Sequence, residues 1–149
     1  MRRTIVVAGI LLLGASAVMA QQEIAVQQDN LMRSQGKSMY NVILKMTKGE
    51  TPYNQKAVDE AFTNLEVDVA KIGKTFEVNP KQDVVNATYG ASQKIWRNKT
   101  DFDSKIPPVQ KAIAEHKGKV HNLASLKAAY TAINDRCGDC HETYRVKLK

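Results

Sequence analysis

The stretch 122–148, NLASLKAAYTAINDRCGDCHETYRVKL, indicates both how this chain folds and where its chemistry lies. Apolar residues and members of a Cys-Gly-Asp-Cys-His motif recur there at steps of three and four: Leu126, Tyr130, Ile133, Cys137, His141, Tyr144 and Leu148. This spacing is typical of one face of an α-helix. The stretch therefore predicts a helix that begins near Asn122 and carries Cys137 and His141 on its buried face.

The motif Cys137-Gly-Asp-Cys140-His141 has the spacing of a covalent haem attachment site. In C-x-x-C-H the two thiols form thioether bonds to one porphyrin, and the adjacent imidazole becomes an axial ligand of the iron. These two cysteines are the only ones in the chain. We therefore expect one covalently attached haem c per chain, with His141 as an iron ligand.

Two other kinds of site share the C-x-x-C spacing, and both are less favoured. A zinc site needs two further ligands, and only His116 and His121 remain beyond the motif. Those histidines precede the last predicted helix, where we expect them to be exposed and without a ligand role. A thioredoxin-like dithiol belongs at the start of a helix in a βαβ unit, whereas this motif lies near the end of a long helical stretch.

The N-terminus has the pattern of a secretory signal peptide. Arg2 and Arg3 precede an apolar run over 5–13, and small residues follow as far as Ala20. The run is too short to span a membrane, so we expect cleavage after Ala20 and no integral membrane association. Residues 21–149 then form a single domain. Thioether attachment of haem takes place outside the bacterial cytoplasm, so the predicted location is the periplasm.

Three further segments have apolar residues at helical spacing, at about 23–48, 55–76 and 92–118. No segment shows the alternation typical of strands, which indicates an all-α protein. Ser92 is a plausible N-cap of the third helix, and Pro107 and Pro108 predict either a kink in it or a break with a second helical piece. Four helices with one apolar stripe each predict an antiparallel up-down-up-down four-helix bundle.

Charge and composition exclude some classes of function. The formal net charge is +7, and it becomes +5 without the two arginines of the signal peptide. Since no dense basic run with interleaved aromatic residues is present, we expect no binding of nucleic acid. The lysines are better explained as a solvated face, with acidic redox partners as a second possibility. No set of nucleophile, base and orienting group indicates an enzyme.

The chain resembles the cytochrome c-prime family, the class II c-type cytochromes, over the whole of 21–149. The residues that carry this resemblance are Leu31-Met32, Lys48-Gly49-Glu50, Lys94-Ile95-Trp96 with Phe102, and the motif followed by Tyr144-Arg145. The beginning Gln21-Gln22-Glu23 together with Leu31-Met32 is most similar to the low-spin branch, cytochrome c-556. In that branch a methionine of the first helix is the sixth iron ligand, which implies Met32 here.

Helix geometry also favours Met32. Met32, Met39 and Met46 are seven residues apart and share one face of the first predicted helix. If the first and last helices are antiparallel, His141 lies beside the N-terminal half of the first one. Met39 and Met46 then lie roughly 10 and 20 Å farther along, too far from the same iron. The alternative is that Met32 only fills the core.

Ligation by His141 and Met32 predicts an electron carrier, because it leaves no open position on the iron. Its partners are then periplasmic redox proteins, and it is a monomer or a homodimer. If Met32 does not ligate, a five-coordinate cytochrome c-prime that binds nitric oxide or carbon monoxide becomes the alternative. Arg145, one helical turn after His141, is a candidate partner of a haem propionate. Gln28 stands where family members often have an arginine, and Trp96 is expected to pack.

Overall fold

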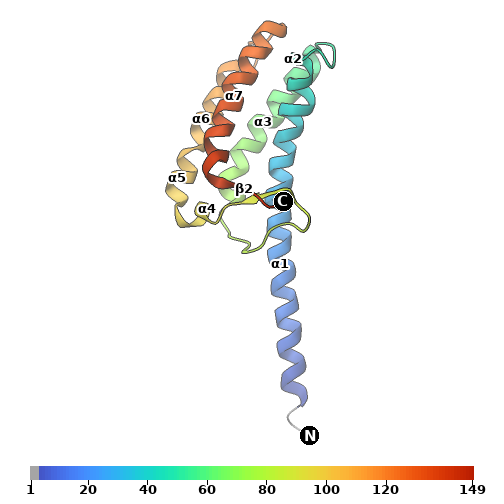
Figure 1. The fold of residues 1–149 in the computed structure, drawn as a ribbon, viewed down its shortest axis with the longest axis vertical. Coiled ribbons are helices and arrows are strands. Elements are labelled where there is room, and N and C mark those ends of the chain that lie inside the picture. Colours follow the sequence, from blue (N-terminus) through green and yellow to red (C-terminus); the bar gives the residue numbers. More distant parts are fainter. Residues whose placement is uncertain (1–3) are drawn as a thin grey trace.

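The computed structural model describes residues 4–149, with side chains from Val18 onward, as long helical segments that run alternately up and down (Figure 1). The first segment consists of α1 (Thr4–Gly36), the π-helix η1 (Lys37–Leu44) and α2 (Lys45–Thr47). The others are α3 (Gln55–Thr75), α6 (Ile106–His116) and α7 (Leu123–Tyr144). The predicted antiparallel four-helix bundle is confirmed.

The predicted signal peptide falls largely on residues whose side chains are not described. Residues 1–3 are not described, and for 4–17 only the backbone is. In that backbone, α1 is continuous from Thr4 through the predicted cleavage point, and its N-terminal part extends beyond the other helices (Figure 1). Cleavage after Ala20 stays a prediction. Within the described part of the chain, no helix combines the length and the apolar character that crossing a membrane requires.

Local sequence signals account for where the bundle helices begin and end. The side chain of Asn54 caps α3 by accepting a hydrogen bond from the Ala57 N–H, 3.0 Å away. Asn122 and Ser125 form a reciprocal capping box at the start of α7. Gly49 and Gly118 have φ values of 75° and 74° where the chain leaves α2 and α6, a conformation that favours glycine.

The first bundle helix departs from the prediction in its middle. Instead of a uniform α-helix over 23–48, residues Lys37–Leu44 form a π-helix that continues α1 without a break. The side chains of Ser38, Met39 and Ile43 are buried there. The wider turn changes the angular spacing of side chains between Met32 and Met46, which an unbroken α-helix would keep on one face.

The third predicted helix is broken rather than kinked. It consists of α4 (Lys94–Arg97), α5 (Lys99–Ser104) and α6. Pro107 lies in the first turn of α6, where its missing N–H costs no intrahelical hydrogen bond. Ser92 lies one residue before the N-cap of α4, and its hydroxyl accepts a hydrogen bond from the Lys94 N–H at 3.3 Å.

The last helix ends earlier than predicted, and a short two-stranded ribbon, which was not predicted, accompanies the all-α fold. After Tyr144 the chain becomes extended as β2 (Arg145–Lys147), which pairs antiparallel with β1 (Tyr89–Ala91). Leu148 therefore lies outside the helical stripe. Gly90, opposite Val146, lies close to the exposed Asp83 side chain, which would have to move to admit a Cβ atom there. Strands this short have no detectable alternation.

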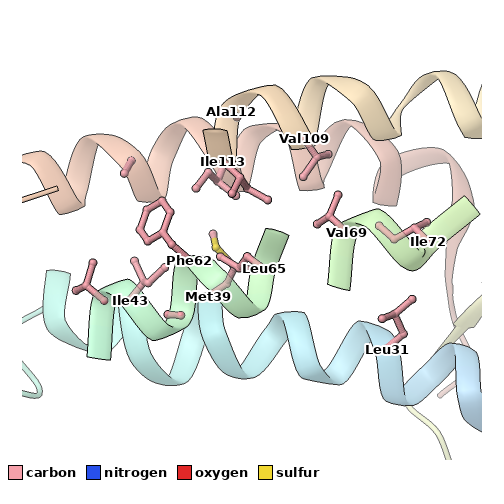
Figure 2. Packing of buried hydrophobic residues seen from close by; sticks show 14 of the residues in the cluster. Leu31, Met39, Ile43, Phe62, Leu65, Val69, Ile72, Val109, Ala112 and Ile113 are labelled. Atoms are coloured by element: carbon pink, nitrogen blue, oxygen red, sulfur yellow. The ribbon is translucent and has the colours of Figure 1, made fainter. Parts of the chain in front are cut away.

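Aliphatic and aromatic side chains from all four bundle segments fill the space between them (Figure 2). Fully buried members of this core are Ile43, Val58, Phe62, Leu65, Val69, Ile95, Ile113, Leu126 and Ile133. The Cys-Gly-Asp-Cys-His motif lies near the C-terminal end of α7, at one end of the bundle. At that end the core gives way to a cavity.

Candidate cofactor site

A cavity of about 450 Å³ lies between α1, the loop and short helices of 80–106, and the C-terminal part of α7. Every site residue predicted from the sequence lines it: Met32, Cys137, Cys140, His141 and Arg145. Its other walls come from Ile72, Phe76, Ile95, Trp96 and Phe102. The cavity is therefore apolar with a few polar groups, as ligand sites usually are.

The motif presents its three reactive groups to this cavity from one face of α7. Cys137 and Cys140 are three residues apart, and His141 is four residues after Cys137, so the three side chains are neighbours on the helix. All three are half-buried. Burial raises the pKa of each thiol to about 11. At neutral pH both are protonated, which is unlike the reactive thiolate of a redox dithiol.

His141 is suited to bind a metal. Burial lowers the pKa of its imidazole to about 4, and the positive charge of Arg145 contributes to the shift. The ring is therefore neutral at pH 7, and one of its nitrogens has a lone pair available for a metal ion.

The zinc alternative finds no support in the geometry. His116 ends α6 and His121 precedes α7, so both lie at the opposite end of α7 from the cysteines. The rise of an α-helix places Cys137 roughly 20 Å from that end. Among the described residues, no three His, Cys, Asp or Glu side chains are placed to hold a metal ion.

A hydrogen bond between α7 and the π-helix fixes how the two helices are aligned. The Tyr40 hydroxyl donates to Oδ1 of Asn134 at 3.4 Å. His141 is seven residues after Asn134 along α7, and since the helices are antiparallel, the level of His141 on α1 is about seven residues before Tyr40. This level falls at Arg33, so its neighbour Met32 lies at about the level of His141.

The other two methionines of the stripe are placed differently. Met39 is 3% exposed and Met46 is 6% exposed, and both belong to the core. Met39 also borders the cavity, but it lies roughly 10 Å farther from the level of His141 than Met32 does. Met32 is half-buried and borders the cavity at about the level of His141.

Aromatic residues form one wall of the cavity. The Phe102 ring packs against Phe76 at 5.6 Å and edge-on against Tyr144 at 5.3 Å between ring centres. The Tyr144 hydroxyl donates to the Asp101 carboxylate, and this bond together with burial raises the pKa of Tyr144 to about 12. Trp96 packs as predicted, and its indole N–H donates to the Phe76 carbonyl at 3.0 Å.

The position of Arg145, the candidate partner of a propionate, differs from the prediction, and Gln28 has a role in the fold. Arg145 is not one turn farther along the helix, because α7 ends at Tyr144; its guanidinium lies over the Tyr89 ring, 4.6 Å from the centroid, at the cavity rim. Gln28 is 3% exposed and donates to the carbonyls of Thr75 and Val78, at 3.1 and 3.0 Å. It ties α1 to the end of α3.

The sequence reasoning missed Gln35 and the residues of 80–91 that wall the cavity. Loop residues at 80–91 carry no periodic signal that would have placed them there. Gln35 could have been found from the sequence, because it is a polar residue on the apolar helix face between Met32 and Met39. Its Nε2 is buried at the cavity without a hydrogen-bond partner. Two thiols, a neutral imidazole, a thioether and an unpaired donor fit a large, mostly apolar cofactor with a metal.

Comparison with known proteins agrees with this geometry. The family model described as Cytochrome C' matches residues 22–145. A protein named cytochrome c-555 from Bradyrhizobium diazoefficiens is 78% identical over 149 residues, the full length of both chains. Cytochrome c-556 from Rhodopseudomonas palustris is 40% identical over 148 residues, 99% of each chain.

Solved structures show the same bundle. The structural model of oxidised R. palustris cytochrome c556 matches with a TM-score of 0.72 and 33% identity, covering 86% of this chain and 99% of that one. Cytochrome c' from R. palustris matches with a TM-score of 0.73 and 26% identity, covering 85% and 98%.

Proposed function

Because this chain belongs to the cytochrome c-prime family, we propose that it is a periplasmic electron carrier with one low-spin haem c. Cys137 and Cys140 form the thioether bonds to the porphyrin. His141 and Met32 are the two axial ligands of the iron. Relatives named cytochrome c-555 and c-556, at 78% and 40% identity, support the electron-carrier function over the whole length of the chain.

The observation that carries the ligand assignment is the alignment of α1 with α7. The hydrogen bond between Tyr40 and Asn134 supports a position of Met32 close to the level of His141, and both side chains border one cavity. The neutral imidazole of His141 needs no deprotonation before it binds iron. Both ligands come from helices whose packed ends are fixed by the core, which favours little movement at the site.

The chain's own residues determine how the iron behaves. Bound haem supplies a one-electron redox couple. A thioether and an imidazole leave no open coordination position and raise the reduction potential. The wall of Phe76, Phe102 and Tyr144 keeps water from one side of the site. Electrons then pass to partner proteins without a bond being made or broken at the iron.

The predicted signal peptide supports the periplasmic location, since thioether attachment takes place after export. Partners are periplasmic redox proteins. The charged residues that line the cavity are Arg33, Lys105 and Arg145 on the basic side and Asp29 and Asp83 on the acidic side, and Arg33 is paired with Asp29. Arg145, held over Tyr89, is the candidate to pair with a propionate at the cavity rim.

The experiment that tests this function compares absorption spectra of the haem-loaded protein with those of Met32→Leu. Wild-type protein is expected to be low-spin, with the weak long-wavelength ferric band of methionine-to-iron charge transfer, and unmoved by carbon monoxide. Met32→Leu is expected to be high-spin and to bind the gas, because leucine has a similar volume but no donor atom.

Met46→Leu is the matched control, because it changes a core methionine of the same stripe that does not border the cavity. Its spectrum should equal that of the wild type. An unchanged spectrum in Met32→Leu would show that Met32 is core filling. A high-spin wild-type protein that binds carbon monoxide would assign a five-coordinate, gas-binding cytochrome c-prime instead.

A further inference from the structure

One buried donor in the cavity has no acceptor. Among the residues whose side chains are described, Gln35 Nε2 is the buried side-chain nitrogen or oxygen atom without a hydrogen-bond partner. An amide N–H removed from water without an acceptor is costly, so native structures rarely keep one. Because Gln35 borders the cofactor cavity, we expect its acceptor to be either the cofactor itself or a side chain that moves when the cofactor binds.

A second glutamine on the same helix, Gln28, has a structural role, and its amide nitrogen is fully hydrogen-bonded to the main chain. Gln28, seven residues earlier and also bordering the cavity, donates to two main-chain carbonyls of the α3 end. Gln35 finds no such carbonyl. The two amides flank Met32, and only the one that follows it is free to bond.

Helix geometry directs the Gln35 side chain toward Met32. Residues three apart on a helix are neighbours, with Cβ atoms about 5–6 Å apart. Side chains of an α-helix lean toward its N-terminus, so Gln35 covers the turn that carries Met32. The alignment fixed by Tyr40 and Asn134 also puts Gln35 level with about residue 139 of α7, inside the haem attachment motif.

We propose that the Gln35 side-chain amide donates a hydrogen bond to the thioether sulfur of Met32 when that sulfur binds the iron. This inference rests on the proposed function. A thioether sulfur has two lone pairs, so it can bind iron with one and accept a weak hydrogen bond with the other. The bond holds the Met32 side chain in its ligating orientation and slows its departure. Gln35 is thus a positioning residue for the sixth ligand.

The test uses haem-loaded Gln35→Leu, which removes the donor at similar size, and Gln35→Asn, which keeps it on a shorter side chain. Carbon monoxide can bind ferrous iron only after Met32 leaves. We expect Gln35→Leu to stay low-spin, to shift the ferric charge-transfer band, and to bind carbon monoxide about three- to tenfold faster, as the loss of one hydrogen bond implies. Gln35→Asn should recover part of the wild-type rate.

Gln27→Leu is the matched control, because it removes an exposed amide from the same helix. Its band and its rate should equal those of the wild type. In ferrous wild-type protein, a nuclear Overhauser effect between the Gln35 amide protons and the Met32 methyl group is also expected, and this measurement needs no variant that folds.

Two results would overturn the inference, and they are distinguishable. If the wild type is low-spin but Gln35→Leu leaves the band and the rate unchanged, the hydrogen bond to Met32 is absent while the electron-carrier function stands. If the wild-type spectrum is high-spin, methionine ligation fails, and the inference fails with it.

Discussion

The two ends of the bundle are built from the same four segments but differ in what fills them. At one end, Phe62, Ile113 and Ile133 are 2%, 1% and 0% exposed, and Phe62 and Ile113 point into the space between the helices (Figure 2). At the other, Met32, Cys137 and His141 are only half-buried around about 450 Å³ of space. Helix packing alone completes the first end. The second end is complete only with its cofactor.

This difference separates stability from chemistry along one helix. The first turns of α7 carry Leu126 and Ile133 into the core, and the last turns carry the haem motif into the cavity. Substitutions at the packed end should therefore change the free energy of unfolding with little effect on the haem absorption spectrum. Substitutions at the cavity end should change the haem absorption spectrum with little effect on the free energy of unfolding.

The largest effect is expected from the double substitution Cys137→Ala with Cys140→Ala, which removes both thioether bonds. Covalent haem should be lost completely, because the chain contains no other thiol. Haem staining of denatured protein measures this directly. Each single variant is the control, since one thioether bond remains possible. Covalent haem in the double variant would refute the site assignment.

At the packed end, Phe62→Ala should lower the free energy of unfolding by about 3–5 kcal/mol, because it leaves a cavity among fully buried neighbours. Denaturant unfolding of the haem-loaded protein measures it. The low-spin spectrum of the folded variant should not change. A changed iron ligation would show that the two ends are coupled, and the comparison would then be wrong.

Tyr144→Phe tests a residue that belongs both to the hydrophobic core and to the cavity wall. The phenol donates to Asp101 while its ring packs on Phe102, so the variant loses one hydrogen bond but keeps the aromatic contact. We expect a loss of about 1–2 kcal/mol in unfolding free energy. Asp101→Asn, which keeps an acceptor, should lose less. An equal or larger loss in Asp101→Asn would contradict this account.

The smallest effect is expected on the surface of α3. Lys56 and Glu60 form an ion pair of 3.9 Å with side chains 87% and 64% exposed. Lys56→Ala should change the unfolding free energy by less than about 0.5 kcal/mol. The same denaturant titration measures it, and a larger loss would mean that this helix surface is covered in the native protein.

The regular parts of this fold could be predicted because apolar spacing encodes helix faces directly. As predicted, Asn122 caps the start of α7 and Pro107 lies in the first turn of α6. The predicted stripe through Leu126 and Ile133 is buried in the core. The reactive groups of the site could also be predicted, since the haem attachment motif is a contiguous Cys-x-x-Cys-His stretch. Met32 was singled out by spacing, although its ligation stays a proposal.

The irregular parts could not be predicted. A π-helix over Lys37–Leu44 has no compositional mark that distinguishes it from an α-helix. The strands β1 and β2 are too short for alternation to show, and they depend on a tertiary pairing between segments far apart in the chain. Arg145 was therefore expected on a helix, when it begins a strand.

The short pairing of β1 with β2 lies at one wall of the cavity, since Thr88, Tyr89, Gly90 and Ala91 line it. Residues that follow the motif hold the loop that walls the site: the Leu148 N–H donates to the Thr88 carbonyl, and the Ser92 N–H donates to the Tyr144 carbonyl, each at 2.9 Å. Three residue pairs form a small cooperative unit, so local opening there costs less free energy than unfolding the bundle. Amide hydrogens of this ribbon should exchange earlier than those of α3. When the pairing of β1 with β2 opens locally, water can enter the cavity while the helices remain folded.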